Sequence, residues 1–136
     1  YYAGPGNKFW PTLFETGLTP RLFPPNEYHL LPNCGIGLTD MAKHVFGSDA
    51  SLPKSADDPQ RVYEMVNEAA PKAIAFVGKR SAQVFFKAHF GLKNMAYGLQ
   101  QQTVRDTKIF VLPSPSGLAA RYWDIGPWQA LAAFIK

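Results

Sequence analysis

The sequence is poor in cysteine and histidine, and each shortage excludes a class of site. Its 136 residues include one cysteine, Cys34. An internal disulfide, a four-cysteine zinc site and a cysteine-ligated iron–sulfur cluster are therefore excluded. Three histidines, at positions 29, 44 and 89, show no metal-ligand spacing to one another or to Cys34. We expect no metal and no cofactor.

Long hydrophobic runs and a signal peptide are also missing. No stretch of about 20 apolar residues occurs, so a membrane-spanning helix is not expected. The start of the chain has no basic segment followed by an apolar core and a small-residue cleavage site. A chain of this length has room for one hydrophobic core, so we expect a single domain over residues 1–136. The single cysteine leads us to expect a reducing compartment.

Acidic residues are scarce in the third quarter of the chain. The whole sequence has 14 Lys and Arg against 10 Asp and Glu, a net charge of +4. This balance suits a polyanionic partner without requiring one. Between positions 79 and 108 Asp106 is the only acid, and the cations are Lys79, Arg80, Lys87, Lys93, Arg105 and Lys108. The alternative is an ordinary solvated surface.

Helical patterns alternate with apolar strand patterns along the chain. Asn7 is a candidate N-cap for a first helix, and Asp58 followed by Pro59 begins another. The expected helical segments are 7–17, 26–31, 58–70, 80–90 and 126–135. The expected strands are 35–41, 72–77 and 108–112, and the segment around Gln100 to Gln102 is expected to be a loop.

The apolar runs at 72–77 and 108–112 are typical of strands buried on both faces. Such strands between helices predict an α/β fold, a parallel sheet covered by helices on both sides. Ligands of such sheets bind beyond the carboxyl ends of the strands. The segments of interest are therefore 39–44, 78–81 and 113–121.

The segment Leu112-Pro113-Ser114-Pro115-Ser116-Gly117-Leu118 follows the second buried strand. Two prolines fix φ on either side of Ser114 and hold its hydroxyl at the strand end. Small residues follow, interrupted by the apolar Leu118, and we expect Gly117 to Ala119 to be flexible. A rigid hydrogen-bonding group beside an apolar wedge suits a base extruded from a nucleic acid. The alternative is a proline-rich turn between strand and helix with Leu118 buried.

The opening segment, Tyr1 to Trp10, combines aromatic residues with glycine and proline. Phe9 and Trp10 are expected in the core. An aromatic ring in such a loop, Tyr2 here, is available to stack on a flat ligand. The alternative for Tyr2 is a loop tyrosine with its hydroxyl in water.

With these segments, the chain resembles the mismatch-specific uracil-DNA and thymine-DNA glycosylases of the uracil-DNA glycosylase superfamily. The resemblance runs nearly end to end, through residues 5–10, 35–41, 77–79 and 112–118 in the same order. It implies a three-layer α/β/α sandwich with a short, mainly parallel central sheet. It also implies a monomeric enzyme, located in the cytoplasm with the nucleoid of a bacterium or in a nucleus.

The resemblance also implies roles for individual residues. Tyr2 stands where the family stacks an aromatic ring on the flipped pyrimidine, with Asn7 in the same substrate-binding segment. Ser114 stands where the family hydrogen-bonds the base. The residues at the family's DNA-contacting positions are Gly117, Leu118 and Ala119 in the wedge, Arg121 beyond it, and Lys79 and Arg80. For Lys79 and Arg80 the alternative is a solvated surface.

Asp40 stands where relatives often have asparagine, and the resemblance gives it a catalytic or base-reading role. An ionised carboxylate accepts from the N3–H of uracil but cannot donate to O4, so base preference is expected to differ from that of an asparagine site. The alternative is that Asp40 caps the loop that follows.

The family's Gly-rich loop after the first strand, which positions the attacking water, would precede Tyr1 and is absent from this sequence. The alternatives are a truncated sequence and a degenerate protein, and we favour truncation because loss of a central strand would expose a sheet edge. No histidine lies in 112–118, so we expect electrostatic assistance rather than a strong general acid.

The expected function is excision of uracil, or a related deaminated or mismatched base, from double-stranded DNA by a monofunctional glycosylase. Nucleotide flipping precedes such chemistry because the glycosidic bond is inaccessible in the stack. Two alternatives are a non-catalytic module of the same fold that binds mismatched or abasic DNA, and a small-molecule α/β enzyme that binds an anion at 113–118.

Overall fold

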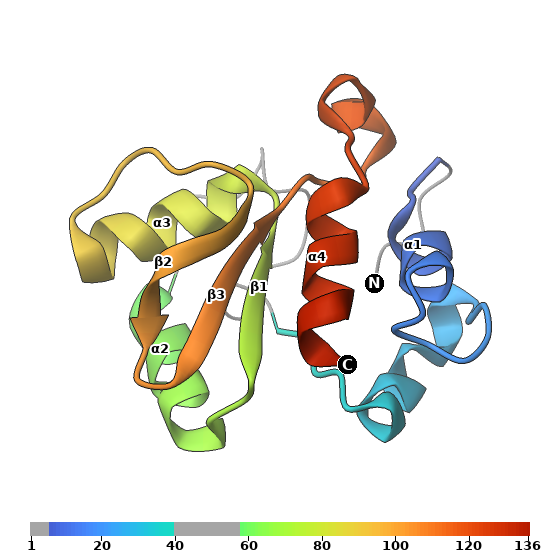
Figure 1. Cartoon of the computed structure of the whole chain (residues 1–136), viewed down its shortest axis with the longest axis horizontal. Coiled ribbons are helices and arrows are strands. Elements are labelled where there is room, and N and C mark those ends of the chain that lie inside the picture. The colour runs from blue at the N-terminus through green and yellow to red at the C-terminus, as the bar shows by residue number, and fades with distance from the viewer. Residues whose placement is uncertain (1–5, 40–57) are drawn as a thin grey trace.

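A computed structural model describes residues 6–39 and 58–136 (Figure 1). Its elements are α1 (Phe9–Glu15), the 3-10 helix η1 (Pro25–Cys34), α2 (Pro59–Ala69), β1 (Ala73–Val77), α3 (Lys79–Phe90), β2 (Gly98–Val104), β3 (Thr107–Leu112), the 3-10 helix η4 (Gly117–Tyr122) and α4 (Gly126–Ile135). Among the described helices none is long and apolar enough to cross a bilayer.

The sheet has the strand order β1-β3-β2. β1 and β3 are parallel, with Val77 opposite Leu112, and both strands were predicted from their apolar runs. β2 pairs antiparallel with β3, so within the described residues the sheet is mixed rather than mainly parallel. The expectation of a loop around Gln100 was wrong, because this polar strand at the sheet edge has no apolar run to reveal it.

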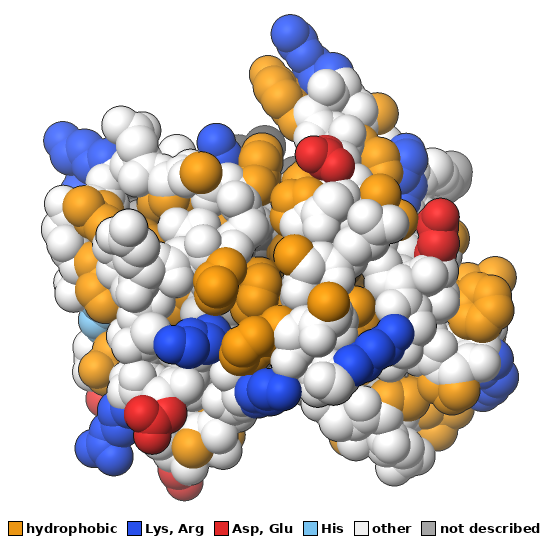
Figure 2. Space-filling model, viewed as in Figure 1, with side chains coloured by type: hydrophobic (Ala, Val, Ile, Leu, Met, Phe, Trp, Pro, Cys, Tyr) orange, Lys and Arg blue, Asp and Glu red, His pale blue; other side chains and the backbone are white. Residues whose placement is uncertain are grey.

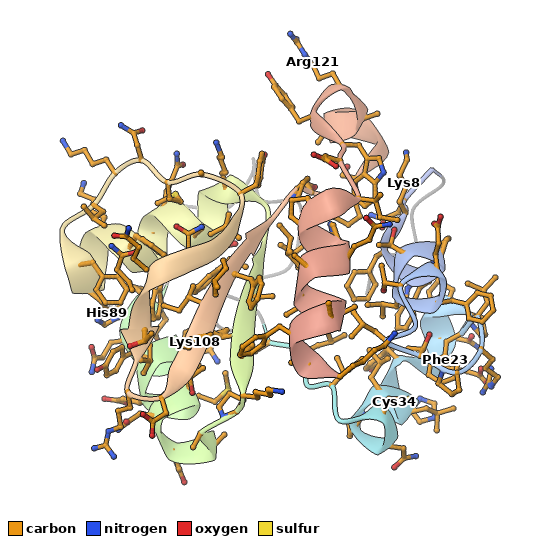
Figure 3. The ribbon with its side chains drawn as sticks, in the orientation of Figure 1. Lys8, Phe23, Cys34, His89, Lys108 and Arg121 are labelled. Carbon is orange, nitrogen blue, oxygen red and sulfur yellow. The ribbon has the colours of Figure 1, made fainter. Side chains whose placement is uncertain are left out.

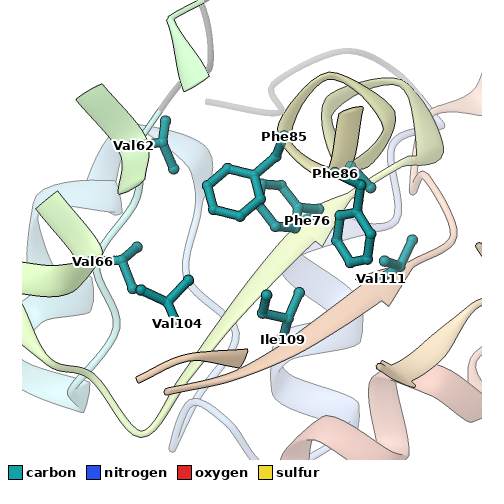
Figure 4. Packing of buried hydrophobic residues seen from close by; sticks show 9 residues of the cluster. Val62, Val66, Phe76, Phe85, Phe86, Val104, Ile109 and Val111 are labelled. Atoms are coloured by element: carbon teal, nitrogen blue, oxygen red, sulfur yellow. The ribbon is translucent and has the colours of Figure 1, made fainter. Parts of the chain in front are cut away.

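Side chains of β3 alternate between two cores, which makes the structure a three-layer sandwich. Ile109 and Val111 pack with α2 and α3 (Figure 4). Phe110 and Leu112 pack on the opposite face with α1, η1 and α4. All four side chains are at most 1% exposed, and burial of each contributes about 1.5 to 3 kcal/mol. The expected α/β fold with helices on both faces is confirmed.

The predicted helices are present with small shifts at their ends. The Asp58 carboxylate accepts a hydrogen bond of 3.0 Å from the Arg61 N–H and caps α2, as predicted. For α1 the cap lies one position later than expected, at Lys8, which makes no side-chain capping bond. The Asn7 Oδ1 atom still accepts from the Phe9 N–H at 2.9 Å, so it satisfies one donor of the first turn.

One local expectation was wrong, and a second segment has a defined turn. Residues 35–39 form no strand in the described part of that segment. Instead Ile36 and Leu38 are partly buried and pack against the core cluster that contains Phe110 and Leu112. Residues 117–119, which were expected to be flexible, lie in η4, and the Ser116 side chain caps this turn.

Candidate functional site

The site is organised around the segment that follows β3. Pro113 and Pro115 are buried and Ser114 is half-buried. The Trp128 indole N–H of α4 donates to the Pro113 carbonyl oxygen at 3.1 Å, inside the protein. Trp128 is 1% exposed, so the bond is shielded from water. α4 therefore anchors the backbone immediately before Ser114.

Parallel pairing of β1 and β3 brings a second segment to Ser114. The Gly78 N–H, just after β1, donates to the Leu112 carbonyl oxygen at 2.8 Å. Gly78 has φ +98, a conformation that favours glycine, and a Cβ atom there would lie 3.7 Å from the Ser114 Cβ. α3 begins at the next residue, so Ser114 and the start of α3 share the carboxyl edge of the sheet.

The Ser114 hydroxyl accepts a hydrogen bond of 3.3 Å from the Ser116 N–H. A serine hydroxyl has one O–H donor and two lone pairs, so it can accept this bond and donate another. The group is thus a neutral, locally oriented donor at the sheet edge. Its chemistry suits hydrogen bonding to a carbonyl oxygen such as that of a pyrimidine.

The beginning of the described chain lies against the same segment. The Lys8 N–H donates to the Pro115 carbonyl oxygen at 2.8 Å. A Cβ atom on Gly6 would lie 4.0 Å from the Gly117 Cα. The Lys8 ammonium lies 5.9 Å from the centre of the Trp123 ring. Residues distant in sequence, around 7 and 115, are therefore neighbours.

η4 projects from this edge of the molecule, with Arg121 at its end (Figures 1 and 3). The Ser116 Oγ accepts from the Leu118 N–H at 3.2 Å and caps the turn. The Leu118 side chain is 99% exposed, so burial in a proline-rich turn, the alternative for this residue, is wrong. Ala119 is half-buried and Gly117 is exposed.

Arg121 and its neighbour form the outer end of η4. The Arg121 guanidinium lies 5.1 Å from the centre of the Tyr122 ring. Tyr122 is 58% exposed, and Figure 2 shows the projection carrying basic and hydrophobic side chains together. This combination matches the interleaved charge and apolar surface used to hold nucleic acids.

Lys79 and Arg80 open α3, directly after Gly78. Lys79 is exposed and Arg80 is half-buried. The Lys79 ammonium lies 4.6 Å from the centre of the Tyr97 ring. Both cations are thus at the edge of the sheet that holds Ser114.

Tyr2 and Asp40, the predicted stacking and base-reading residues, lie outside the described residues. Across 6–39 and 58–136, no three His, Cys, Asp or Glu side chains gather as metal ligands would.

Sequence reasoning missed Trp128, Trp123 and Tyr97. Their aromatic residue types indicate only packing, and their contacts with Pro113, Lys8 and Lys79 arise from tertiary structure.

The whole sequence was compared with models of protein families. The model described as the uracil DNA glycosylase superfamily matches residues 1–135. The match includes the segment from Pro5 to Trp10, the turn at Gly78 and the segment around Ser114. Members of this superfamily are generally DNA glycosylases, which act on DNA. The match over nearly the full length, with the layered α/β fold, shows that the chain belongs to the uracil-DNA glycosylase superfamily.

Proposed function

We propose that this protein excises uracil, or a related deaminated or mismatched base, from double-stranded DNA. It acts as a monofunctional glycosylase of the mismatch-specific type and leaves an abasic site. The observation that carries the proposal is the juxtaposition of two side chains: Leu118, 99% exposed on a projecting turn, and the half-buried Ser114 hydroxyl four residues earlier.

An exposed leucine on a projection is suited to entering a base stack. Flipping a nucleotide costs a few kcal/mol, because pairing and stacking are lost. Burying a leucine side chain recovers about 1.5 to 3 kcal/mol. Leu118 thus offsets much of the cost when it fills the vacated position, with Gly117 and Ala119 allowing the DNA backbone to approach.

Ser114 is proposed to bind the flipped base and to assist its departure. The bond between C1′ and the base nitrogen breaks, and its electron pair leaves on the base. The water oxygen then bonds to C1′, and the proton it releases balances protonation of the base. Donors aimed at a pyrimidine oxygen stabilise this developing negative charge more than they stabilise the ground state.

Tyr2 and Asp40 complete the proposed site on the strength of the sequence. Tyr2 stacks on the flipped base, and Asp40 reads its edge. Gly6, four residues after Tyr2, lies beside Gly117 in the structure, which supports placing a stacking residue of this segment near the wedge. Asn7 is proposed to bind substrate, although its Oδ1 atom already accepts from the Phe9 N–H.

Cations at the carboxyl edge of the sheet are proposed to contact DNA phosphates. Lys79 and Arg80 contact the strand near the flipped nucleotide, and Arg121 contacts the backbone or the unpaired base opposite. Such contacts position the duplex without reading its sequence. The protein is proposed to act as a monomer on DNA in the cytoplasm or nucleus, without a cofactor.

The test is incubation with duplex DNA that contains one uracil, followed by alkali to reveal abasic sites. The reference reaction is the same duplex with thymine paired to adenine. We expect strand breaks at uracil only after alkali. Binding to the uracil duplex without breaks would favour the non-catalytic module, and breaks without alkali would contradict a monofunctional enzyme.

Ser114→Ala tests the chemical role, with Ser81→Ala as its matched control. Ser81 is a second partly buried serine near this edge, and its hydroxyl donates to the Gly78 carbonyl oxygen at 3.3 Å. Loss of one transition-state donor slows catalysis by roughly 100-fold or more. We expect that loss in single-turnover excision for Ser114→Ala only. Equal single-turnover excision rates for the two variants would show that the Ser114 hydroxyl does not assist catalysis.

A further inference from the structure

We propose that Tyr97 is a positioning residue, which holds the Lys79 ammonium at the edge of the sheet where a DNA phosphate is bound. This inference rests on the proposed function for the identity of the partner. Tyr97 lies between α3 and β2, immediately before Gly98, the first residue of β2. Four observations on the ring, the cation and their positions in the fold support this role.

The first observation is the contact itself. The Lys79 ammonium lies 4.6 Å from the centre of the Tyr97 ring, within the range of a cation–π interaction. Lys79 is exposed, whereas Tyr97 is half-buried. The ring is therefore the fixed partner and the lysine side chain is the one restrained.

The second observation is that Tyr97 is supported from behind. It packs against the core cluster that includes Phe85, Phe86 and Val111. The next residue, Gly98, has φ +102, which favours glycine, and begins β2 opposite Val111. The turn into β2 and the core together determine where the ring lies.

The third observation is topological. Val111, opposite Gly98, lies three residues before Ser114. Val77, opposite Leu112 in the parallel pair, lies two residues before Lys79. Strand pairing therefore brings the ring and the ammonium to the edge that holds Ser114, although positions 79 and 97 are separated by the whole of α3.

The fourth observation concerns chemistry. An ammonium has three N–H donors on a flexible four-carbon stem. A ring face occupies one side of the ammonium and leaves donors for phosphate oxygens. Lysine loses rotamer freedom when it binds, so restraint before binding makes a phosphate contact more favourable. Tyr97 thus strengthens DNA binding without touching DNA.

The experiment is a double-mutant cycle on the full chain, with Tyr97→Leu and Lys79→Gln alone and together. Leucine keeps apolar bulk and removes the ring face, and glutamine removes the charge. The measurement is the equilibrium dissociation constant for an undamaged DNA duplex at several salt concentrations. Binding to undamaged DNA involves no excision, so a protein without glycosylase activity can still pass or fail this test.

We expect Tyr97→Leu to weaken binding about two- to tenfold, because the unrestrained lysine side chain then loses its rotamer freedom only when it binds. The same substitution should have no effect when Lys79 is already glutamine. Lys79→Gln should also reduce the slope of log K against log salt by about 0.9. Tyr97→Phe, which retains the ring face, should bind like the unaltered protein.

A matched control lies at the amino end of β1, the opposite end of the strand from Lys79. Lys72, immediately before β1, has its ammonium 4.9 Å from the centre of the Phe134 ring. Phe134→Leu removes a contact of the same kind and should leave DNA binding unchanged. If Phe134→Leu weakened DNA binding as much as Tyr97→Leu does, both substitutions would be acting by destabilising the fold.

Three results would overturn the inference: unchanged binding by Tyr97→Leu, equal weakening with and without Lys79, or tighter binding, which would mean that the ring withholds the ammonium. If Tyr97→Leu does not fold, nuclear magnetic resonance of the unaltered protein decides. The Lys79 Hε protons should be shifted upfield by the ring and remain so in the DNA complex. Loss of that shift on binding would show that the lysine leaves the ring.

Discussion

Leu118 and Ser114 lie four positions apart in the segment after β3 and differ in exposure. Leu118 is 99% exposed and Ser114 is half-buried between two buried prolines. An exposed leucine contributes little to folding, since it gains almost no burial. Its presence on a capped, projecting turn is instead suited to contact with another molecule.

Leu118→Ala should leave the free energy of unfolding unchanged to within about 0.5 kcal/mol, because the side chain is outside the core. Excision of uracil from duplex DNA should slow on the order of tenfold, since about 1.4 kcal/mol of wedge burial corresponds to that factor. Excision from single strands should change much less. Single-turnover rates on both substrates measure the difference.

Leu22→Ala is the control for this substitution. Leu22 is 53% exposed and lies between α1 and η1, so the same truncation is made away from η4. Its excision rates should match those of the unaltered protein. Equal slowing on duplex and single-stranded DNA by Leu118→Ala would reject the wedge role.

Among the elements, α4 has the clearest structural role at the site. It covers one face of the sheet and also holds the Pro113 carbonyl oxygen through the Trp128 indole, at 3.1 Å. η4 stands between β3 and α4 in the chain. The projecting segment is therefore held by β3 at one end and by α4 at the other. We expect a substitution in α4 that breaks the Trp128–Pro113 bond to change the position of Ser114.

Trp128→Phe should lower the free energy of unfolding by about 1 to 3 kcal/mol, because the buried Pro113 carbonyl loses its donor. The smaller ring adds a cavity cost. Chemical denaturation measures the change. The folded variant should also excise uracil more slowly, because the segment holding Ser114 is less restrained. A stability within 0.5 kcal/mol of the unaltered protein would show that the bond contributes little.

For the molecule as a whole, the fold brings cations that are dispersed in sequence to one end of the sheet. Lys8 contacts the segment after β3, Lys79 and Arg80 open α3, and Arg121 ends the projection. The net charge of +4 is modest. Its distribution therefore matters more than its size for binding a polyanion.

Affinity for undamaged duplex DNA should fall steeply with salt. Each phosphate contact contributes a slope of about −0.9 in log K against log salt, so the three proposed contacts of Lys79, Arg80 and Arg121 predict roughly −3. Arg121→Gln should reduce the slope by about 0.9. Arg21→Gln is the control, because Arg21 pairs with Glu27 at 2.9 Å near η1. A slope near −1 would contradict a DNA surface at this edge.

Much of the architecture was predictable from local patterns. The apolar runs predicted β1 and β3, and Asp58 with Pro59 predicted the start of α2. These signals are local, because burial on both faces requires apolar residues and a helix start requires a cap. The same logic failed for β2, where an edge strand tolerates polar side chains and Gln100 resembles a loop residue.

The sequence by itself determined the family, since the family depends on residue types in a given order. The sequence also named candidate residues for the proposed site, among them Ser114 and Leu118, through the resemblance to that family. Only the tertiary structure decided which residues surround those candidates. Gly78 lies beside Ser114, the Lys8 N–H donates to the Pro115 carbonyl oxygen, and the Lys79 ammonium lies over the Tyr97 ring. These neighbours are made by strand pairing and helix docking between distant segments, and no local pattern records such contacts.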